Sequence, residues 1–319
     1  MNNFKVLDLF SGMGGFSYGF SCRGFKTTGV DIKEEAGKTY KKLTNGEFIQ
    51  LDLHTNLIDD TEYDIIIGGP PCRPWSSINL TKRGIEHPDY TLVSRFMEHI
   101  KFHKPKLFIM ENVPPLSNDL ILTEFISLTR NMGYSVDKMK VTYSDFGASV
   151  RRTRLIVSGI LDSDVNDFFW NMSSESRQAN TVKDAIFSLR DKDYGAIPDH
   201  IWPNLKTIKK YTEYYKKGKY GWRLLKWNEP APSFGNVMKT YTLHPDSSLE
   251  NNMFRTISVA EAARIMGFPK NFFFPDDISM GLKYQMIVDS VSPVFSIVVA
   301  KFAHNIMNEE YDYVPGKEP

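Results

Sequence analysis

Short apolar runs alternate with amphipathic segments over the first half of the chain. Between residues 4 and 159, β-branched runs of strand length are followed by stretches whose apolar residues recur at helical spacing. This alternation is typical of a parallel sheet covered by helices. The predicted strands are residues 5–9, 27–31, 48–51, 64–68, 107–110 and 155–160, and the predicted helices are residues 16–22, 34–43, 91–102 and 120–132. We therefore expect a doubly wound α/β domain.

The pattern changes after about residue 162. The periodicity weakens, the composition shifts toward Asn, Ser, Lys, Tyr and Pro, and prolines at positions 198, 203, 230 and 232 predict breaks. Order returns near residue 256, where Ser258 and Glu261 have the spacing of a capping box. The apolar stripe at residues 294–302 needs a core, which the first domain offers. We therefore predict a catalytic and cofactor-binding domain at residues 1–165, a smaller domain at 166–254, and a segment at 255–319 that returns to the first domain.

The composition is that of an ordinary globular chain. Of its 319 residues, 41% are hydrophobic and 24% are charged. The first five residues carry no basic segment followed by an apolar run, and the apolar stretch at 291–300 is half the length of a membrane span. Cys22 and Cys72 match no paired metal-ligand spacing, so we expect a reducing compartment and no metal. These features predict a cytoplasmic protein without a membrane segment.

The net charge of +1 hides an uneven distribution. Residues 206–226 contain eight Lys or Arg and one acidic residue, Glu213, interleaved with four tyrosines and a tryptophan. Such a mixture suits neutralisation of phosphates and contact with bases. Taken alone, the segment is explained more simply as a solvated helix with half-buried tyrosines.

A glycine-rich turn follows the first predicted strand. The run Asp-Leu-Phe-Ser-Gly-Met-Gly-Gly at residues 8–15 lets the backbone approach a nucleotide-like ligand without Cβ clashes. Ser17 stands where a dinucleotide fingerprint needs glycine, which argues against a pyrophosphate site. Asp31 ends the second strand and is placed to accept hydrogen bonds from ribose hydroxyls, and Asp52 is placed likewise for an adenine amino group. Because strand ends of such a sheet meet at one edge, we expect an adenosine site there.

A second group of residues has the chemistry of a nucleophilic site. Cys72 follows an apolar strand in the proline-stiffened turn Gly-Pro-Pro-Cys-Arg-Pro-Trp-Ser at residues 69–76. Glu111 follows another strand and can donate a proton if burial raises its pKa. Arg152 and Arg154 alternate onto one face of a strand, where two guanidinium groups suit a phosphate or a carbonyl oxygen. A small buried cysteine and a helix-capping glutamate are the structural alternatives.

In these motifs the chain resembles the cytosine-C5 DNA methyltransferase family. The run at residues 8–15, Pro70-Pro71-Cys72, Glu111-Asn112-Val113 and the Arg-x-Arg pair occur in the order of that family and at compatible spacing. Residues 255–264 with Phe268-Pro269 resemble its later helix-and-loop motif, and Thr242-Leu243 resembles a pair in its target-recognition region. The resemblance implies a Rossmann-like, S-adenosylmethionine-dependent methyltransferase sheet with a smaller target-recognition domain. Residues 165–254 are the least specific part of the match.

The resemblance also implies a mechanism. Cys72 would add to C6 of cytosine while Glu111 donates to N3, so that C5 can take the methyl group of S-adenosylmethionine and leave S-adenosylhomocysteine. Arg154 would hold O2 of the base and Arg152 a flanking phosphate, and the base would also meet the carbonyl of Pro70 and the side chain of Ser76. The residues implied for the cofactor pocket are Phe10, Gly12, Gly14, Asp31, Asp52, Pro71 and Ser290.

The implied substrate is double-stranded DNA. A stacked base hides C5 and C6, so the target cytosine must be flipped out of the helix. The loop at residues 76–89, with Lys82, Arg83 and Gly84, is the kind of segment that closes over a flipped base. With DNA as the partner, the basic and aromatic segment at 206–226 becomes a candidate for backbone contact. The resemblance further suggests a monomer in a restriction-modification or phage-protection role, with a cognate endonuclease that acts separately.

Three positions depart from the family pattern. Arg73 and Val150 stand where many members have glutamine, and Val288-Asp289 replaces the usual Gly-Asn. By the layout of the family, Asp289 would lie near Glu111, where a second carboxylate would raise the proton affinity of the pair. This departure leaves the expected fold intact.

Four other classes of protein fit the sequence less well. A tRNA cytosine methyltransferase of the same fold is disfavoured because the Cys-Phe-Thr tripeptide of that subgroup is absent. A catalytically inactive DNA-binding paralogue is disfavoured by the intact cysteine, glutamate and arginines. Ser17 and the cysteine loop oppose a nicotinamide dehydrogenase. A zinc hydrolase is excluded because Ile100 stands between His99 and His103 where that motif needs glutamate.

Overall fold

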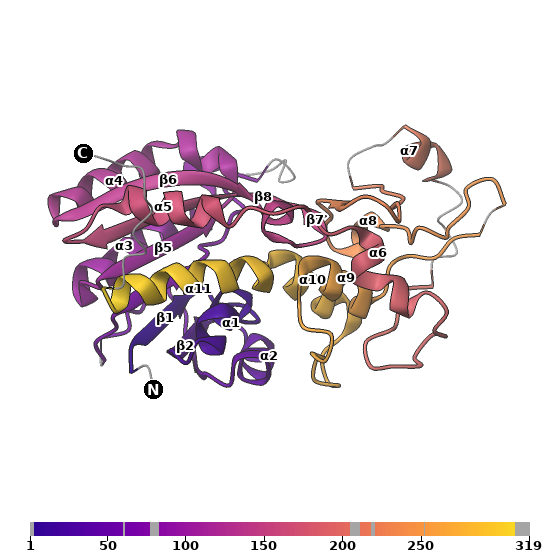
Figure 1. Cartoon of the computed structure of the whole chain (residues 1–319), viewed down its shortest axis with the longest axis horizontal. Coiled ribbons are helices and arrows are strands. Elements are labelled where there is room, and N and C mark those ends of the chain that lie inside the picture. The colour runs from indigo at the N-terminus through magenta and orange to yellow at the C-terminus, as the bar shows by residue number, and fades with distance from the viewer. Residues whose placement is uncertain are drawn as a thin grey trace.

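A seven-stranded sheet forms the centre of the larger lobe (Figure 1). The computed structural model describes residues 3–59, 61–76, 83–204, 211–217, 221–251 and 253–309. In spatial order the strands are β3 (Glu47–Gln50), β2 (Lys26–Asp31), β1 (Lys5–Leu9), β4 (Ile65–Gly68), β5 (Leu107–Asn112), β8 (Thr153–Leu161) and β6 (Tyr134–Thr142). The chain moves outward in one direction from β1 and in the other from β4. This topological switch point lies between those two strands, where such sheets bind ligands.

Helices cover both faces of this sheet. One core joins alternate strand residues such as Ile65 and Ile109 to α1 (Gly15–Cys22), α5 (Val165–Ser174) and α11 (Pro293–Met307). The other joins the intervening residues, such as Ile66 and Phe108, to α3 (Leu92–His103) and α4 (Leu120–Asn131). The remaining helices are α2 (Glu34–Thr44), α6 (Val182–Ile186), α7 (Thr212–Lys216), α8 (Val237–Thr240), α9 (Val259–Met266) and α10 (Met280–Asp289). The predicted strands and helices of the first half are thus confirmed.

The expectation of a parallel sheet is wrong at one edge. β8 pairs antiparallel with both β5 and β6, and β6 itself was not predicted. Only ten residues separate the end of β6 from the start of β8, too few for the crossover that a parallel pair requires, so the chain turns back directly. In β6 the polar residues Asp137, Lys138 and Lys140 are interspersed with apolar ones, as suits an edge strand exposed on one side.

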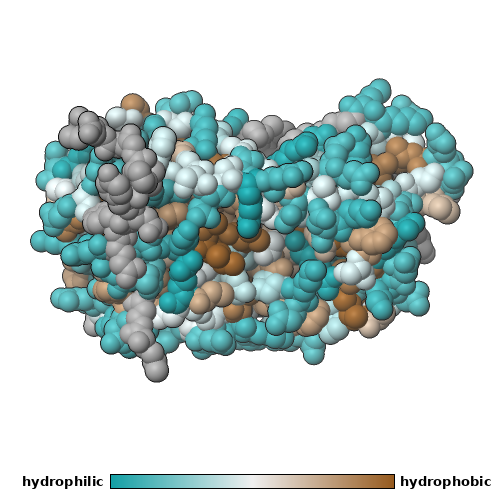
Figure 2. Space-filling view, viewed as in Figure 1, coloured by the Kyte–Doolittle hydropathy of each residue, from teal (hydrophilic) through white to brown (hydrophobic). Residues whose placement is uncertain are grey.

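The C-terminal segment returns to the large lobe. Ser258 and Glu261 form the predicted capping box at the start of α9. α11 then runs along α1, where the backbone N–H of Gly19 donates to Ser296 Oγ over 2.9 Å. The segment Met280–Met307 has the length and composition of a membrane span, but 72% of its apolar window is buried inside the fold. Figure 2 shows a mostly hydrophilic face, with apolar side chains gathered near the middle, where α11 runs.

Close contact between α1 and α11 requires glycine at position 19. A Cβ there would lie 2.2 Å from the backbone oxygen of Ser296, so the two helices would have to separate. We expect Gly19→Ala to lower the free energy of unfolding by about 2 to 4 kcal/mol, measured by urea denaturation. Gly281→Ala is the matched control, because Gly281 also lies in a helix but its Cβ would meet only Met238 Sδ at 3.6 Å. An equal effect of both substitutions would contradict this packing.

The smaller lobe lies at the right of Figure 1 and contains α6, α7 and α8. Its own small core centres on Tyr215 and Leu243, and Tyr211 stacks on Trp222 with ring centroids 4.3 Å apart. A short parallel pair, β7 (Val150–Arg151) with β9 (Ala231–Pro232), joins this lobe to the large one. Of the basic and aromatic segment, residues 206–210 and 218–220 lie outside the described part. In the rest of that segment the aromatic rings pack largely against one another.

Candidate active site

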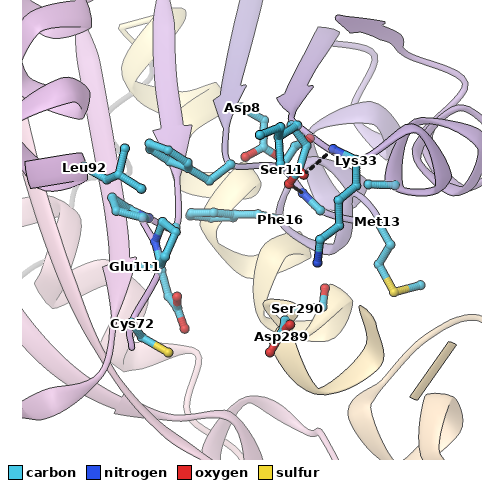
Figure 3. A pocket seen from close by; sticks show the side chains of 18 of the residues that line it. Asp8, Ser11, Met13, Phe16, Lys33, Cys72, Leu92, Glu111, Asp289 and Ser290 are labelled. Atoms are coloured by element: carbon cyan, nitrogen blue, oxygen red, sulfur yellow. Dashed lines mark hydrogen bonds between the residues drawn. The ribbon is translucent and has the colours of Figure 1, made fainter. Parts of the chain in front are cut away.

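One cavity opens at the carboxyl ends of β1, β2, β4 and β5. Its volume is about 420 Å³, within the usual range for a small-molecule site. Its walls are the glycine-rich turn, the cysteine loop, the arginines that precede and begin β8, and the end of α10 (Figure 3). The predicted site residues that line it are Phe10, Gly12, Asp31, Asp52, Pro70, Pro71, Cys72, Glu111, Arg152, Arg154 and Ser290. Gly14 and Ser76 are not part of the lining.

The glycine-rich turn shapes the cofactor side of the cavity. Phe10 and Gly12 have φ angles of 59° and 52°, so the chain turns sharply after β1. No atom lies within 4 Å of the position that a Cβ of Gly12 would take, which leaves room for a ligand against the backbone. Gly14 serves the fold instead, because its φ of 91° begins α1 and a Cβ there would lie 2.8 Å from Tyr40 Cδ2.

Asp31 is fixed by the backbone at the mouth of this turn. Its carboxylate accepts from the N–H of Gly12 over 3.0 Å and from the N–H of Lys33 over 3.1 Å. Burial raises the pKa of Asp31, and these N–H groups oppose that rise. Asp52 is more exposed and accepts from both the N–H and the ring of His54, which lowers its pKa. Two carboxylates at successive strand ends thus face the same cavity.

Asp8 is a buried acid at the base of the cavity. It accepts from Ser17 Oγ over 2.7 Å, and Tyr40 donates to the same hydroxyl over 2.8 Å. Burial raises the pKa of Asp8 to about 7, the negative charge of Asp31 adds to this rise, and the hydrogen bonds with Ser17 oppose it. Ser17, which argued against a pyrophosphate site, therefore has a structural role as the partner of this carboxyl.

The raised pKa of Asp8 predicts a dependence of stability on pH. The folded protein holds the proton more tightly than the unfolded chain, whose Asp titrates near 3.8. This contribution to stability is fully present below pH 3.8 and is lost as the pH rises through about 7. Asp8→Asn removes the titration, so its stability relative to wild type should grow between pH 4 and 8, by at most about 4 kcal/mol.

Urea denaturation at several pH values measures this difference. Exposed Asp193 provides the control, because Asp193→Asn should leave the slope of stability with pH as it is in the wild type. A difference between Asp8→Asn and wild type that stays constant from pH 4 to 8 would contradict a buried, titrating Asp8.

Cys72 is held on a rigid loop directly after β4. Asn112 Nδ2 donates to the carbonyl of Pro70 over 3.0 Å, and the N–H of Trp75 donates to the carbonyl of Cys72 over 3.0 Å. Trp75 is in turn anchored by Asp119, whose Oδ2 accepts from the indole over 2.8 Å. The Pro70 carbonyl keeps a second lone pair for another donor. Sequence reasoning had treated Asn112 only as part of a motif, and no signal in the chain indicated Asp119.

Glu111 and Arg154 form an ion pair at the thiol. Arg154 Nε lies 2.8 Å from Glu111 Oε1, and the buried hydroxyl of Tyr143 donates to the same oxygen over 3.1 Å. Arg154 Nη1 donates to the Thr153 carbonyl, and its Nη2 has no partner among the described residues. Figure 3 shows the Cys72 sulfur and the Glu111 carboxylate pointing into the same part of the cavity. Tyr143 was missed, because it lies beyond the unpredicted strand β6.

The surroundings of Cys72 disfavour its thiolate form. Burial raises the pKa of the thiol, the positive charges of Arg154 and Arg152 oppose this, and Glu111 and Asp289 add to it. The thiol is therefore not activated by its surroundings alone, and its proton must leave as the sulfur attacks. Burial also lowers the pKa of Arg152 to about 10.

Two predicted features have unexpected contacts. Arg152 is 8% exposed and donates through Nη2 to the carbonyl of Val288 over 2.5 Å, so it ties the end of α10 to the cavity. Asp289 lines the cavity as expected, but its oxygens accept from Gln285 Nε2 over 2.8 and 2.9 Å, while Glu111 is engaged by Arg154 and Tyr143. The predicted loop at 76–89 is described only at Ser76 and from Arg83 onward, and Lys82 lies outside the described residues.

A Rossmann-like sheet, with a strand-end cysteine that shares a cavity with a buried glutamate, is the arrangement that the resemblance to cytosine-C5 methyltransferases implied. The model of the C-5 cytosine-specific DNA methylase family matches residues 4–304, so the chain belongs to this family and is a DNA cytosine methyltransferase. It is 27% identical to the type II methyltransferase M.FnuDI of Fusobacterium nucleatum, over 93% of each chain. It is 28% identical to the type II methyltransferase M.NlaX of Neisseria lactamica, over 90% of this chain and 92% of that protein.

Solved structures share the fold. The Dnmt2 methyltransferase of S. pombe superposes with a TM-score of 0.73 at 18% identity, covering 95% of this chain and 99% of that one. The methyltransferase EhMeth of Entamoeba histolytica gives a TM-score of 0.72 at 19% identity, covering 98% of this chain and 100% of that one.

Proposed function

We propose that the chain methylates C5 of a cytosine flipped out of duplex DNA, through a covalent adduct with Cys72. The observation that carries this proposal is the shared cavity of Cys72, Glu111 and Arg154, which continues to the glycine-rich turn and Asp31. The cavity therefore combines a nucleophile, Cys72, a proton donor, Glu111, and a hydrogen-bond donor to the base oxygen, Arg154. The same cavity includes the pocket for the methyl donor. Restriction-modification is the proposed context, supported by the type II methyltransferases among the relatives.

The cavity fits S-adenosylmethionine. The open space at Gly12 admits a ligand against the backbone, Asp31 and Asp52 offer acceptors to a ribose and an adenine, and Phe10, Pro71 and Ser290 complete the wall. Bound S-adenosylmethionine supplies an electrophilic methyl group. We propose no metal in this reaction, because nucleophile and acid both come from side chains.

In the proposed mechanism the sulfur of Cys72 forms a bond to C6 of the cytosine, and the thiol proton passes to solvent. Glu111, in its protonated form, gives a proton to N3, so electron density builds at C5. Arg154 turns its unused Nη2 to O2 of the base, while the Pro70 carbonyl accepts from the exocyclic amino group. After methylation the C5 proton passes to solvent and its electron pair re-forms the C5–C6 double bond. The sulfur–carbon bond then breaks with its electron pair returning to Cys72, and N3 returns its proton to Glu111.

Entry of the base must rearrange the ion pair of Glu111 and Arg154. In the structure Arg154 occupies the carboxylate oxygen of Glu111, whereas the mechanism needs that carboxyl to face N3 of the base. We propose that the base inserts its O2 and N3 edge between the two side chains, so that Arg154 donates a hydrogen bond to O2 instead of to Glu111. Tyr143, fully buried behind them, keeps Glu111 in place during the exchange.

We propose that residues 166–254 read the DNA, with residues 1–165 and 255–319 forming the catalytic part. Lys216 and Lys217 of the basic and aromatic segment are exposed and suit phosphate contacts, whereas the neighbouring rings form the lobe's core. Arg152 as a phosphate ligand, Ser76 as a base contact, a monomeric state and a cytoplasmic location remain predictions from the sequence. The existence of a cognate endonuclease also remains a prediction from the sequence.

Incubation with S-adenosylmethionine labelled in its methyl group tests the proposal. Label should enter duplex DNA and appear as 5-methylcytosine after hydrolysis, and bisulfite sequencing then gives the recognition site. Transfer RNA is the comparison substrate. Label that enters RNA alone would overturn the DNA assignment, and label on an adenine or on a cytosine amino group would overturn the mechanism.

A further inference from the structure

Most charged side chains of the cavity already have partners. Glu111 pairs with Arg154, Asp52 with His54, and Arg152 bonds to a backbone carbonyl. Asp8, Asp31 and Arg152 bond only to neutral groups, and all three are buried or half-buried. Lys33 and Asp289 are exposed and also form no ion pair in the described part of the chain. The ammonium of Lys33 makes no hydrogen bond or ion pair there, and Asp289 accepts only from the neutral amide of Gln285.

These two charges face the same part of the cavity from different walls. Lys33 precedes α2, and Figure 3 shows its side chain reaching into the cavity with the ammonium directed toward the wall of Ser290 and Asp289. A lysine on a helix start is more often extended into solvent, where its charge is fully hydrated. Its charge acts on Asp31, where it opposes the burial that raises the pKa of that carboxyl, although the two side chains form no ion pair.

Asp289 is held in position by a chain of amides. Gln285 Nε2 donates to both of its oxygens, and Gln285 Oε1 accepts from Asn236 Nδ2 over 3.2 Å. Asn236 is itself fixed, because it donates to the carbonyl of Gly281 over 3.0 Å and caps α8. The carboxylate therefore keeps its place on the cavity wall although it is exposed.

A ligand that satisfies both charges must carry an anion and a cation a few bonds apart. The amino-acid group of the proposed methyl donor has this composition, since it ends in a carboxylate and an ammonium. With the ribose at Asp31 and the methyl group beside Cys72, that group would lie between the glycine-rich turn and the wall that Lys33, Ser290 and Asp289 contribute to. We propose that Lys33 binds the carboxylate of the donor and Asp289 binds its ammonium group.

This pair of contacts selects the intact amino-acid end of the donor. It rests on the proposed use of S-adenosylmethionine and adds two residues that the motifs did not indicate in this role. Asp289 then has a specific purpose in this chain, where many relatives of the family pattern have an asparagine. Because both side chains are exposed, we expect each contact to change affinity by about three- to tenfold.

Titration calorimetry with the full chain tests the pair. The variants are Lys33→Met and Asp289→Asn, and the control is Lys38→Met, since Lys38 lies on the same helix but pairs with Glu34 and Asp277. The probes are S-adenosylmethionine, its decarboxylated form and 5′-methylthioadenosine, which lacks the whole amino-acid group. Lys33→Met should weaken the binding of S-adenosylmethionine but not the binding of its decarboxylated form. Asp289→Asn should weaken the binding of both S-adenosylmethionine and its decarboxylated form. Neither variant should change the affinity for methylthioadenosine.

The outcomes separate this inference from the proposed function. If both variants bind S-adenosylmethionine as tightly as the wild type does, the inference is overturned and the cofactor assignment still stands. An equal loss for methylthioadenosine would also overturn it, because the substitutions would then act on the shape of the pocket. A wild-type protein that binds none of the three probes would overturn both.

Discussion

Replacing Cys72 by alanine should lower the rate of methyl transfer by at least about a thousandfold while DNA and S-adenosylmethionine still bind. The sulfur is the only group of the described cavity lining that combines nucleophilic character with a rigid place after a strand. Without it, C5 of cytosine has no route to become nucleophilic. Label transfer to duplex DNA measures the rate, and a gel-shift assay measures DNA binding.

Cys22 provides a matched control for this substitution. It is the other cysteine of the chain, lies exposed on α1 and takes no part in the cavity. Cys22→Ala should therefore leave the rate unchanged. A Cys72→Ala enzyme with more than a few per cent of wild-type activity would show that methyl transfer proceeds without the covalent step.

Replacing Glu111 by glutamine should lower the rate by about a hundred- to ten-thousandfold. The amide keeps the size of the side chain but cannot give a proton to N3, and it also leaves Arg154 without its carboxylate. Single-turnover kinetics with excess enzyme isolates the chemical step from DNA binding.

Replacing Tyr143 by phenylalanine distinguishes the proton-donating role of Glu111 from the hydrogen bond that holds Glu111 in place. It removes one hydrogen bond to the same oxygen of Glu111 and leaves the carboxyl in place, so we expect a loss of about tenfold or less. If Glu111→Gln were no more harmful than Tyr143→Phe, Glu111 would be a structural residue and another group would protonate N3.

The strand ends were the part of the site that the sequence predicted best. In a doubly wound sheet the carboxyl ends converge, so residues directly after apolar runs, such as Asp31, Cys72 and Glu111, must share one edge. The order of the strands was not needed for this inference. The capping box of α9 was equally predictable, because Ser258 and Glu261 act over three residues.

Contacts between distant positions were beyond such reasoning. Arg152 bonds to the Val288 carbonyl 136 residues away, and Tyr143 reaches Glu111 from beyond a strand that the pattern did not reveal. The antiparallel course of β8 also depends on a neighbour, because an apolar run looks alike in either direction. Gly14 shows a further limit, since it belongs to a cofactor motif and yet packs against Tyr40.

Lys33 illustrates how a functional charge escapes a motif search. It stands two residues after Asp31 at the start of an ordinary amphipathic helix, beside other lysines of α2 that are solvated. Only its direction into the cavity, across from Asp289, distinguishes it.

The covalent adduct itself gives the most direct test of the mechanism. Duplex DNA in which 5-fluorocytosine replaces the target cytosine cannot lose a proton from C5, so the sulfur–carbon bond should persist after methylation. We predict a protein–DNA complex that survives denaturant in the presence of S-adenosylmethionine, with the modified base attached to the peptide that contains Cys72. Active enzyme that forms no such complex, or a complex attached at another residue, would contradict the account.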